Sequence, residues 1–531
     1  MANDVAIGID LGTSYSCVSI IENGVPRVIA GESGDYIHAS VVSFLDDGSV
    51  LVGNAAKNDP SLDPKNTIAS AKRLIGRFFF SEEVKKARAL MPYEIVEGPN
   101  GSVNIRARGR DFSLPEISAL VLKALKMLAE DDLGREVTDA VITVPAFFND
   151  NQRQATRDAG RIAGLNVLRI LNEPTAAALT YGCGQAMDQR VAVYDFGGGT
   201  FDISILEIRD DMFEVLSTAG DTYLGGDDLD EQIVQWLARD FKKRHAFDPT
   251  NDPAILQRLR KVAETAKIEV GRQGVARIHQ PAFCHDGEGR DLSIDATLTE
   301  AEFNRMAAPI IQRSFKVCDE AMQSAHLNAS EIDAVILVGG PTRLPIIRTS
   351  VQHYFGKQPL TSVDPDKVVS IGAAYQAHAL ASQSGADYHL LDVTPLTLRI
   401  GTVGGFCEKI IDRNTPIPIE QSKTFTTSRD LQDKVRIRVY QGESNRADEC
   451  ELLGEFEFSG FRVALRGEVK IEVTFEIDTN GIVNVSACER ATGLRASTTI
   501  QLSSGLSEAD IEAGRQNNSD LPVAMGATPN A

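Results

Sequence analysis

Two glycine-rich turns, far apart along the chain, carry the residue types that a phosphate group requires. In each, an apolar run ends at an aspartate, and glycines with a hydroxyl residue follow: Asp10-Leu11-Gly12-Thr13-Ser14 and Asp195-Phe196-Gly197-Gly198-Gly199-Thr200. Glycine lets backbone N–H groups approach phosphate oxygens, and carboxylates hold Mg²⁺ directly or through water. One such turn is weak evidence, because a glycine after a strand is usually only a turn. Two matched copies predict a phosphate-binding cleft with Asp10 and Asp195 facing each other across it.

A third glycine turn, Val338-Gly339-Gly340-Pro341-Thr342-Arg343, follows an apolar run and opens a helix. Its glycines would let the chain pass close to a flat ligand such as a nucleoside. Taken alone, the turn is equally well read as an ordinary strand-to-helix connection.

The elements that must position these turns are of two kinds. Up to about Ser384, β-branched runs such as 140–144, 191–194 and 334–338 alternate with helical segments, which predicts an α/β architecture. The repeated order of strand, aspartate, glycine turn and strand indicates that this part is duplicated. From Asp392 to about Ser503, short alternating segments such as 435–439 and 471–475 predict an all-β sandwich. The segment 387–392 between them is partly apolar, so we expect it to dock rather than to hang free.

Composition limits the function classes. The chain has 531 residues and a formal charge of -20, which disfavours nucleic acid and anionic membranes as partners. The first ten residues do not resemble a secretory signal, so the sequence predicts a cytoplasmic protein. The seven cysteines show no zinc spacing and are expected to be reduced.

The last residues are expected to be mostly disordered. Ser507 is a plausible helix N-cap, but Gly514, Asn517, Asn518 and Pro522 predict that a helix beginning there is short. The sequence therefore favours a loose tail over residues 506–531.

Longer strings of residues narrow the choice of family. The chain resembles the seventy-kilodalton heat-shock (DnaK-like) chaperones of bacterial type in Ile7-Gly8-Ile9-Asp10-Leu11-Gly12-Thr13, Ala71-Lys72-Arg73-Leu74-Ile75-Gly76-Arg77, Val144-Pro145-Ala146-Phe147-Phe148, Asn172-Glu173-Pro174-Thr175-Ala176-Ala177-Ala178, Phe196-Gly197-Gly198-Gly199-Thr200-Phe201-Asp202, Asp392-Val393-Thr394-Pro395-Leu396 and Ser503-Ser504-Gly505-Leu506. The resemblance implies an actin-like (duplicated ribonuclease-H-like) ATPase domain over residues 1–384 and a linker over 385–392. A β-sandwich peptide-binding domain over 393–505 and a short tail without the family's helical lid would follow.

The resemblance also implies roles for single residues. Lys72 and Glu173 would position the attacking water, Thr200 would lie at the γ-phosphate, and Asp10, Asp195 and Asp202 would hold Mg²⁺ or K⁺. Without the family, Lys72 reads as a surface lysine and Glu173 as an acid at a helix start. The positions that would contact ATP or ADP are Gly12, Thr13, Ser14, Tyr15, Gly197, Gly198, Gly199, Thr200, Gly225, Gly226, Glu264, Lys267, Gly339, Gly340, Arg343 and Asp366. Gly271 stands where the family usually has a serine, so one hydrogen bond to the nucleoside is expected to be absent.

Further residues match the family's peptide cleft and its interdomain contacts. The cleft positions are Ile400, Val403, Phe425, Val435, Ile437 and Ile471, each of which could equally be plain sandwich core. Interdomain contacts are implied for Pro145, Arg153, Arg169, Leu390, Leu391 and Asp392. Arg169, Asn172 and Asp392 match the face that receives a J-domain co-chaperone, and a nucleotide exchange factor is a further expected partner. Tyr388 and His389 replace aliphatic linker residues, which predicts altered docking.

The sequence leaves three possible functions open. The leading hypothesis is an ATP-dependent chaperone that binds extended apolar segments of unfolded proteins and releases them under control of the nucleotide. An alternative is a non-cycling ATP-binding regulatory or holdase protein with weakened coupling between its domains. A small-molecule kinase on the same fold is disfavoured, because kinases of this superfamily lack a domain like residues 392–503.

Overall fold

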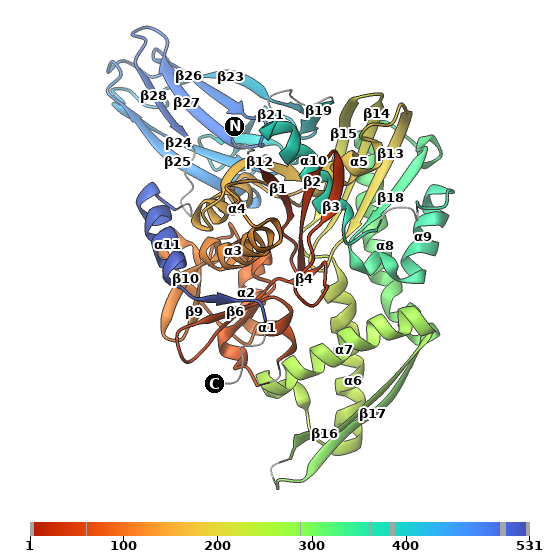
Figure 1. Cartoon of the computed structure of the whole chain (residues 1–531). Coiled ribbons are helices and arrows are strands. Elements are labelled where there is room, and N and C mark those ends of the chain that lie inside the picture. The colour runs from red at the N-terminus through yellow and green to blue at the C-terminus, as the bar shows by residue number, and fades with distance from the viewer. Residues whose placement is uncertain are drawn as a thin grey trace.

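The computed structural model describes residues 5–59, 61–286, 288–360, 364–382, 388–499 and 506–526. The chain builds two α/β lobes with a β-sandwich set against them (Figure 1). We call residues 5–182 the first lobe, 188–360 the second lobe and 398–499 the β-sandwich.

A mixed sheet forms the centre of the first lobe. Its order is β12-β11-β1-β2-β3, with β1 antiparallel to β2 and parallel to β11. The bounds are β1 Ala6–Asp10, β2 Tyr15–Glu22, β3 Val25–Val28, β11 Asp139–Val144 and β12 Asn166–Asn172, with β4 His38–Ala39 pairing β2. β1 and β11 are almost fully buried, as expected for strands covered on both faces.

The second lobe repeats this connectivity. β13 is antiparallel to β14, β14 is antiparallel to β15, and β18 runs parallel to β13. Their bounds are β13 Asp188–Phe196, β14 Phe201–Arg209, β15 Met212–Asp221 and β18 Ala334–Val338. Asp10 and Asp195 thus occupy equivalent places, each at the end of a strand that leads into a glycine turn, so the duplication predicted from sequence is present in the topology.

Two helices, α5 Glu173–Gly182 and α10 Val368–Ala381, pack closely on the strands that carry these turns. The approach depends on glycine. A Cβ on Gly8 would lie 2.0 Å from the backbone nitrogen of Ala374, and one on Gly372 would lie 1.8 Å from the carbonyl oxygen of Ala176. No side chain fits at either position without moving the backbone.

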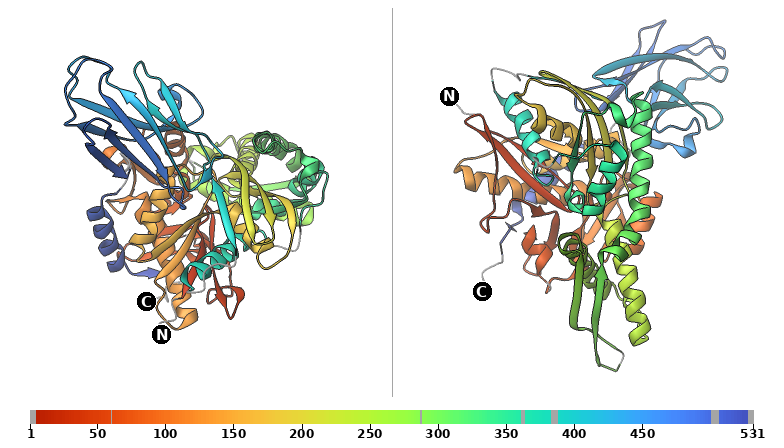
Figure 2. Two further views of the ribbon diagram at one scale, coloured as in Figure 1. Left: turned by 90° about the horizontal axis from the view of Figure 1, so that it is seen from above. Right: turned by 90° about the vertical axis from the view of Figure 1, so that its right-hand side faces the viewer.

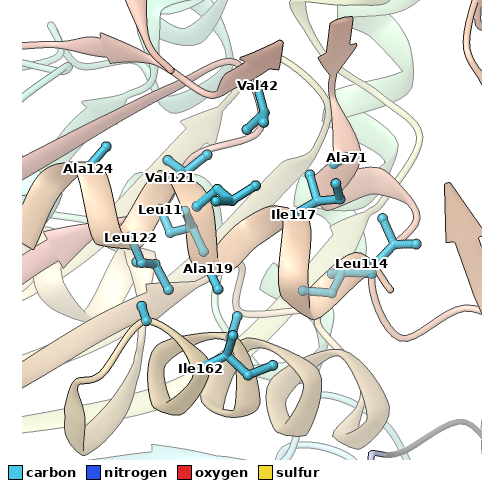
Figure 3. Packing of buried hydrophobic residues seen from close by; sticks show 14 of the residues in the cluster. Leu11, Val42, Ala71, Leu114, Ile117, Ala119, Val121, Leu122, Ala124 and Ile162 are labelled. Atoms are coloured by element: carbon cyan, nitrogen blue, oxygen red, sulfur yellow. The ribbon is translucent and has the colours of Figure 1, made fainter. Parts of the chain in front are cut away.

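Two further helices complete the first lobe. α3 Leu114–Leu133 and α4 Asp150–Ile162 each begin with a capping box, at Ser113 and Asn149. Figure 3 shows apolar side chains of α3, among them Ile117 and Leu122, packed between Leu11 and Val42 of the sheet region and Ile162 of α4.

The remaining helices and strands of the lobes cover the central sheets or extend from them. In the first lobe they are β5 Val41–Phe44, β6 Val50–Val52, α1 Asn54–Asn58, β7 Thr67–Ala69, α2 Glu82–Leu90, β8 Glu94–Glu97, β9 Val103–Ala107 and β10 Arg110–Ser113. In the second lobe they are α6 Gly226–His245, α7 Pro253–Gln273, β16 Val275–His285, β17 Asp291–Thr299, α8 Glu300–Ser324 and α9 Pro345–Phe355. The β16–β17 hairpin projects beside α6 and α7 (Figures 1 and 2).

The β-sandwich consists of two four-stranded sheets, β21-β20-β24-β25 and β23-β26-β27-β28. Its strands are β20 Leu398–Gly401, β21 Cys407–Ile411, β23 Ile419–Thr426, β24 Lys434–Gln441, β25 Glu451–Ser459, β26 Lys470–Ile477, β27 Val483–Glu489 and β28 Arg495–Thr499. One apolar cluster joins both sheets and includes Val439, Leu453, Val473 and Phe475. The alternating sequence pattern therefore predicted this architecture.

The segment between lobes and sandwich docks as a strand. β19 His389–Val393 pairs in parallel with β15 and antiparallel with β22 Pro416–Ile417. Tyr388 is buried, and its ring lies edge-on against Phe213 at 5.9 Å between centroids, whereas His389 faces out. The docked strand therefore accommodates both the aromatic Tyr388 and the polar His389.

The prediction of a mostly disordered tail is wrong for residues 506–526. α11 Glu508–Asp520 starts at a capping box on Ser507, as expected, but continues through Gly514 and Asn518, and β29 Val523–Ala524 follows it. Gly514 is tolerated because α11 packs closely against Ile162 and Glu116 of α4 and α3. Tertiary contacts thus override a weak local helix propensity.

Two expectations from the composition concern the cysteines and the presence of membrane-spanning helices. The seven cysteines, all of which lie among the described residues, are not joined in disulfide bonds. Among the described residues, no helix combines the length and the apolar character that crossing a bilayer demands.

The packing at Gly8 gives a stability prediction. Gly8→Ala should lower the free energy of unfolding by about 3 kcal/mol or more, because overpacking against backbone cannot be relieved by rotating a side chain. Gly526→Ala, where a Cβ meets nothing within 4 Å, should change it little. Denaturant unfolding of both variants checks this, and equal stabilities would contradict the close approach.

Candidate active site

A cleft of about 390 Å³ lies between the two lobes, where the three glycine turns meet. The turns contribute Gly12, Thr13 and Ser14, then Gly197, Gly198 and Thr200, then Gly339 and Gly340; Asp10, Tyr15, Lys72, Glu173, Asp195, Gly226, Glu264, Lys267, Arg343 and Asp366 complete the predicted set that lines it. The cleft therefore collects residues from positions 10 to 366 of the chain.

The first two turns touch each other. A Cβ on Gly198 would lie 2.1 Å from the Ser14 hydroxyl oxygen, and one on Gly12 would lie 2.0 Å from the Tyr15 carbonyl oxygen. The amide of Gly226, at the start of α6, donates to the carbonyl of Gly197 at 2.9 Å. The two turns therefore pack closely against each other. Their glycine backbone lines the cleft, as phosphate recognition requires.

Lys72 is a buried residue, so its interpretation as a surface lysine is wrong. Its ammonium donates to Glu173 Oε1 at 2.7 Å and to the carbonyl of Leu11, and the ring of Phe148 lies 5.4 Å away. Glu173 is the first residue of α5, where the helix dipole favours a carboxylate. Lys72 thereby joins its loop to the start of α5 and to the turn that follows Asp10.

Three predicted metal ligands are acids in the same region: Asp195 and Asp202 are buried, and Asp10 is half-buried. Burial raises the pKa of Asp10 and of Asp202 to about 7, and it raises the pKa of Asp195 well above its usual range. Oδ2 of Asp195 is buried without a hydrogen-bond partner. Such acids favour a nearby cation, because a positive charge would offset the cost of their burial.

The carboxylates do not form a ready-made cage. Within the described part of the chain, no three His, Cys, Asp or Glu side chains gather closely enough to hold one ion. Thr143 donates to Asp10 at 3.3 Å, and the amide of Phe147 donates to Asp202 at 2.9 Å. The arrangement fits Mg²⁺, which usually keeps several waters and takes few protein ligands.

The third turn and α7 face each other across the other end of the cleft. Gly339 has a φ of +86°, and a Cβ there would lie 2.3 Å from the carbonyl oxygen of Phe196. Arg343 Nε donates to Asp366 at 2.8 Å, and Lys267 donates to Asp230 at 2.7 Å. These pairs hold the charged groups at the edges of the cleft and leave the space between the two walls open.

Gly271 lies against the apolar side chain of Leu344. A Cβ at position 271 would lie 2.5 Å from Cδ2 of Leu344. Leu344 therefore gives this part of the cleft wall an apolar surface.

Three predicted residues do not line the cleft. Gly199 faces Arg73 and Thr13, Gly225 caps α6 behind Gly198, and Asp202 lies behind the wall against Phe147 and Gly220. Gly199 and Gly225 shape the turns, because a Cβ on either would lie within 2.5 Å of a neighbouring atom.

Two further residues, Lys57 and Asp230, bond residues of the cleft although the sequence did not point to them. Lys57 bridges the lobes by donating to the Tyr15 hydroxyl at 2.7 Å and to Glu264 at 2.8 Å, and Asp230 pairs with Lys267. Both lie on surface helices whose charged residues show no pattern that could have singled them out.

The predicted interdomain residues form a connected network. Arg153 donates to the carbonyl of Ala146 at 3.0 Å and to Asn172 Oδ1 at 2.7 Å. Asn172 in turn donates to Asp392 at 2.8 Å, and Thr175 donates to the same carboxylate at 3.2 Å. Pro145 is buried next to this network, Leu390 packs on the apolar core and Leu391 is partly exposed. The strand β19 is therefore bonded to the start of α5, which carries Glu173.

The β-sandwich contacts the first lobe through Arg169, which was predicted as an interdomain residue, and through Asp150, Ile170 and Arg77, which were not. Asp150 at the start of α4 accepts a hydrogen bond from the amide of Val483 at 2.8 Å, and Asn480 Oδ1 accepts one from the amide of Ile170 at 3.1 Å. Arg169 donates to the carbonyl of Thr479 at 3.3 Å. Arg77, five residues after Lys72, lies 3.6 Å from Glu451 of the sandwich. No local signal marks these residues, since each pair joins positions hundreds of residues apart.

The predicted peptide-cleft residues divide into three groups. Ile400, Ile437 and Ile471 are buried in the sandwich core, which agrees with the plain structural interpretation. Phe425 and Val435 are partly buried and pack against that core. Val403 is 77% exposed, in the turn between β20 and β21.

Comparison of the chain with protein-family models gives one match. A family model described as "Hsp70 protein" matches residues 6–523, nearly the whole chain. The chain belongs to the Hsp70 family. Members of this family are chaperones and ATPases that bind ATP or ADP with Mg²⁺ and typically work with unfolded clients, J-domain proteins and exchange factors.

The buried Asp150 gives a pH prediction. Burial raises the pKa of this carboxyl to about 7, the N–H of Val483 and Arg153 lower the pKa, and Asp478 raises it. Because the raised pKa belongs to the docked form, docking is firmest at low pH and weakens as the pH rises from about 4 to about 7. Asp150→Asn should remove that dependence.

Small-angle X-ray scattering between pH 5.5 and pH 8 checks the prediction through the radius of gyration. The wild-type chain should expand toward pH 8 more than the Asp150→Asn variant, with the exposed Asp188→Asn as a control that behaves like wild type. An equal expansion in Asp150→Asn would contradict it.

Proposed function

We propose that this chain is an ATP-dependent chaperone whose lobes hydrolyse ATP and whose β-sandwich binds extended apolar segments of clients. The observation that supports this most directly is the cleft itself, which unites two matched glycine turns with the buried Lys72–Glu173 pair. The proposal divides the chain into an actin-like ATPase domain over residues 1–384, a linker over 385–392 and a peptide-binding domain over 393–505.

In the proposed reaction, Lys72 and Glu173 position a water molecule for attack on the γ-phosphorus, and ADP leaves with the bond electrons. Both side chains are fixed by their mutual hydrogen bond, so little reorganisation accompanies the attack. Thr200 and the backbone of the two turns hold the phosphoryl oxygens. Mg²⁺, held by Asp10 and Asp195 through water with Asp202 behind them, would neutralise phosphate charge, and K⁺ is a further proposed ion.

The opposite end of the cleft is proposed to hold the nucleoside. Gly339 and Gly340 let the backbone of the third turn approach a flat base, with Arg343 beside it. Glu264 and Lys267 lie on the facing helix α7. The Leu344 side chain near Gly271 gives this end an apolar surface on which a base can stack.

Coupling between the two activities is proposed to run through β19. Asp392 is bonded to Asn172 and Thr175, and Glu173 lies between these two residues in the sequence. A change in the ligand at the phosphate end of the cleft therefore shifts the start of α5, and this shift changes the docking of β19. By the same linkage, a change in the docking of β19 must alter nucleotide binding. Asn172 and Asp392 are buried in this arrangement, so a J-domain co-chaperone would reach that face only after the sandwich moves.

Client binding is proposed at the end of the sandwich around Val403. Phe406, Leu431, Val463 and Leu465 are also exposed there or in neighbouring turns, and the amide of Leu431 bonds the carbonyl of Ala464 at 2.9 Å. An extended client would gain main-chain hydrogen bonds and place apolar side chains among these residues and Phe425.

One observation favours the alternative of a non-cycling holdase. The segment after the sandwich packs on the first lobe through α11 and β29, so the sandwich is tethered at a second place besides β19. Client-stimulated ATP turnover separates the two functions, because only a cycling chaperone shows it.

The catalytic assignment predicts a separation of binding from turnover. Lys72→Ala should lower ATP turnover by about a hundredfold or more, because it removes a group that acts on the reacting water, while ADP binding persists through the many other contacts. Single-turnover hydrolysis and calorimetric ADP binding measure the two effects. Lys85→Ala, an exposed lysine paired with Glu82, is the matched control, and unchanged turnover in Lys72→Ala would refute the assignment.

The client site predicts a loss of affinity without loss of stability. Val403→Asp should weaken binding of a labelled leucine-rich heptapeptide about tenfold or more, because it places a charge in the apolar site. Val25→Asp, at an exposed valine of the first lobe, should leave the affinity unchanged. Fluorescence anisotropy measures both, and equal affinities would remove Val403 from the site.

A further inference from the structure

The C-terminal segment (residues 506–526) has a built seat on the first lobe. Ile511 is buried in the core of that lobe, and Asn518 is buried and donates to the carbonyl of Glu116 at 3.3 Å. Lys123 of α3 donates to the carbonyls of Asn518 and Leu521, at 2.6 and 3.0 Å, where α11 ends. A lysine at the last carbonyls of a helix satisfies groups that otherwise have no partner.

After α11, the segment adds a strand to an arm of the first lobe. β29 pairs in parallel with β6 at the edge of the sheet β29-β6-β5-β7, and the amide of Val50 donates to the carbonyl of Pro522 at 2.9 Å. Figure 1 shows α11 running beside α4 and α3 toward β6. An extended segment that covers a sheet edge is bound by main-chain hydrogen bonds, so the edge of β6 is a strand-addition site.

The strand also packs on a small apolar cluster next to the nucleotide cleft. Ala524 packs on the cluster of Ala39, Val41, Leu51 and Ala56, together with Tyr15 and Ala55. Tyr15 lines the cleft. Ala55 and Ala56 belong to α1, which begins directly after β6 and Gly53.

The same short helix links the two lobes beside the cleft. Lys57 of α1 donates to the Tyr15 hydroxyl and to Glu264 of the second lobe, and the carbonyl of Asn58 accepts a hydrogen bond from Lys261 at 3.2 Å. The seat of α1 therefore helps to join the first lobe to α7. β29 contributes to that seat through Ala524.

We propose that the strand β29 of this chain binds the edge of β6 to set the lifetime of bound nucleotide, by supporting α1 and the Lys57–Glu264 bridge. The inference rests on the proposed nucleotide binding and adds a regulatory site to it. When the C-terminal segment leaves its seat, α1 loses part of its packing and nucleotide escapes faster.

The test measures release of fluorescent N-methylanthraniloyl-ADP with Mg²⁺ from the full chain, chased by excess ATP in a stopped-flow instrument. Ala524→Asp should raise the release rate about fivefold or more, the lower end of common coupling strengths. Gly526→Asp adds the same charge two residues later, where a Cβ meets nothing within 4 Å, and should match wild type. Lys123→Gln, which loosens the other end of the segment, should also speed release.

A double variant tests the route. Lys57→Gln alone should speed release, and Ala524→Asp should add little to it, because both act on one bridge. Additive effects, or equal release rates in wild type and Ala524→Asp, would overturn the inference. The inference would also be overturned if the wild-type chain formed a dimer and released nucleotide faster on dilution. In that case the strand on β6 would come from a second copy. Failure of the wild-type chain to bind ADP would instead remove the proposed function on which the inference rests.

Discussion

The structure depends on an imbalance of buried charge where the two lobes meet. Asp10, Asp195, Asp202 and Glu173 bring four acids into one region, and Lys72 is a cation that bonds Glu173 and offsets the charge of the three aspartates. Burying acids without compensation is costly, and a paired charge repays the cost only when the geometry is good. The surrounding elements supply that geometry: Lys72 sits in a turn that is followed, after Arg73, by Leu74 and Ile75, which are buried in the core. A site of this kind is most stable when a cation and phosphates fill it, so ligand and lobe closure are linked by electrostatics.

Much of this site could be predicted from sequence, and the reason is local. Each of the three glycine turns directly follows a buried strand, so strand and turn can be recognised together in one short run of consecutive residues. The duplicated connectivity was visible because the same order of strand, aspartate and glycine occurs twice. In contrast, the burial of Lys72 followed only from the family resemblance, because nothing near position 72 announces a partner 101 residues away.

The parts that sequence reasoning missed depend on contacts between distant segments. Gly514 and Asn518 should weaken a helix, yet α11 includes both because Ile162 and Glu116 receive them. Asp150 and Val483 meet across the boundary between lobe and sandwich, and only the fold brings them together. Ile400, Ile437 and Ile471 match a family binding motif but lie in the core, which shows that a motif position can serve the scaffold of a site instead of its surface.

The pairing of β29 with β6 has a consequence for biosynthesis. β6 is made within the first tenth of the chain, whereas its neighbour Val523–Ala524 comes almost at the end of these 531 residues. While the chain emerges from the ribosome, the edge of β6 therefore stays open, and an open edge invites pairing with other chains. At common elongation rates of about 5–20 residues per second, that exposure lasts on the order of half a minute or more. The nascent first lobe is thus itself a candidate for protection by other chaperones until its last strand arrives.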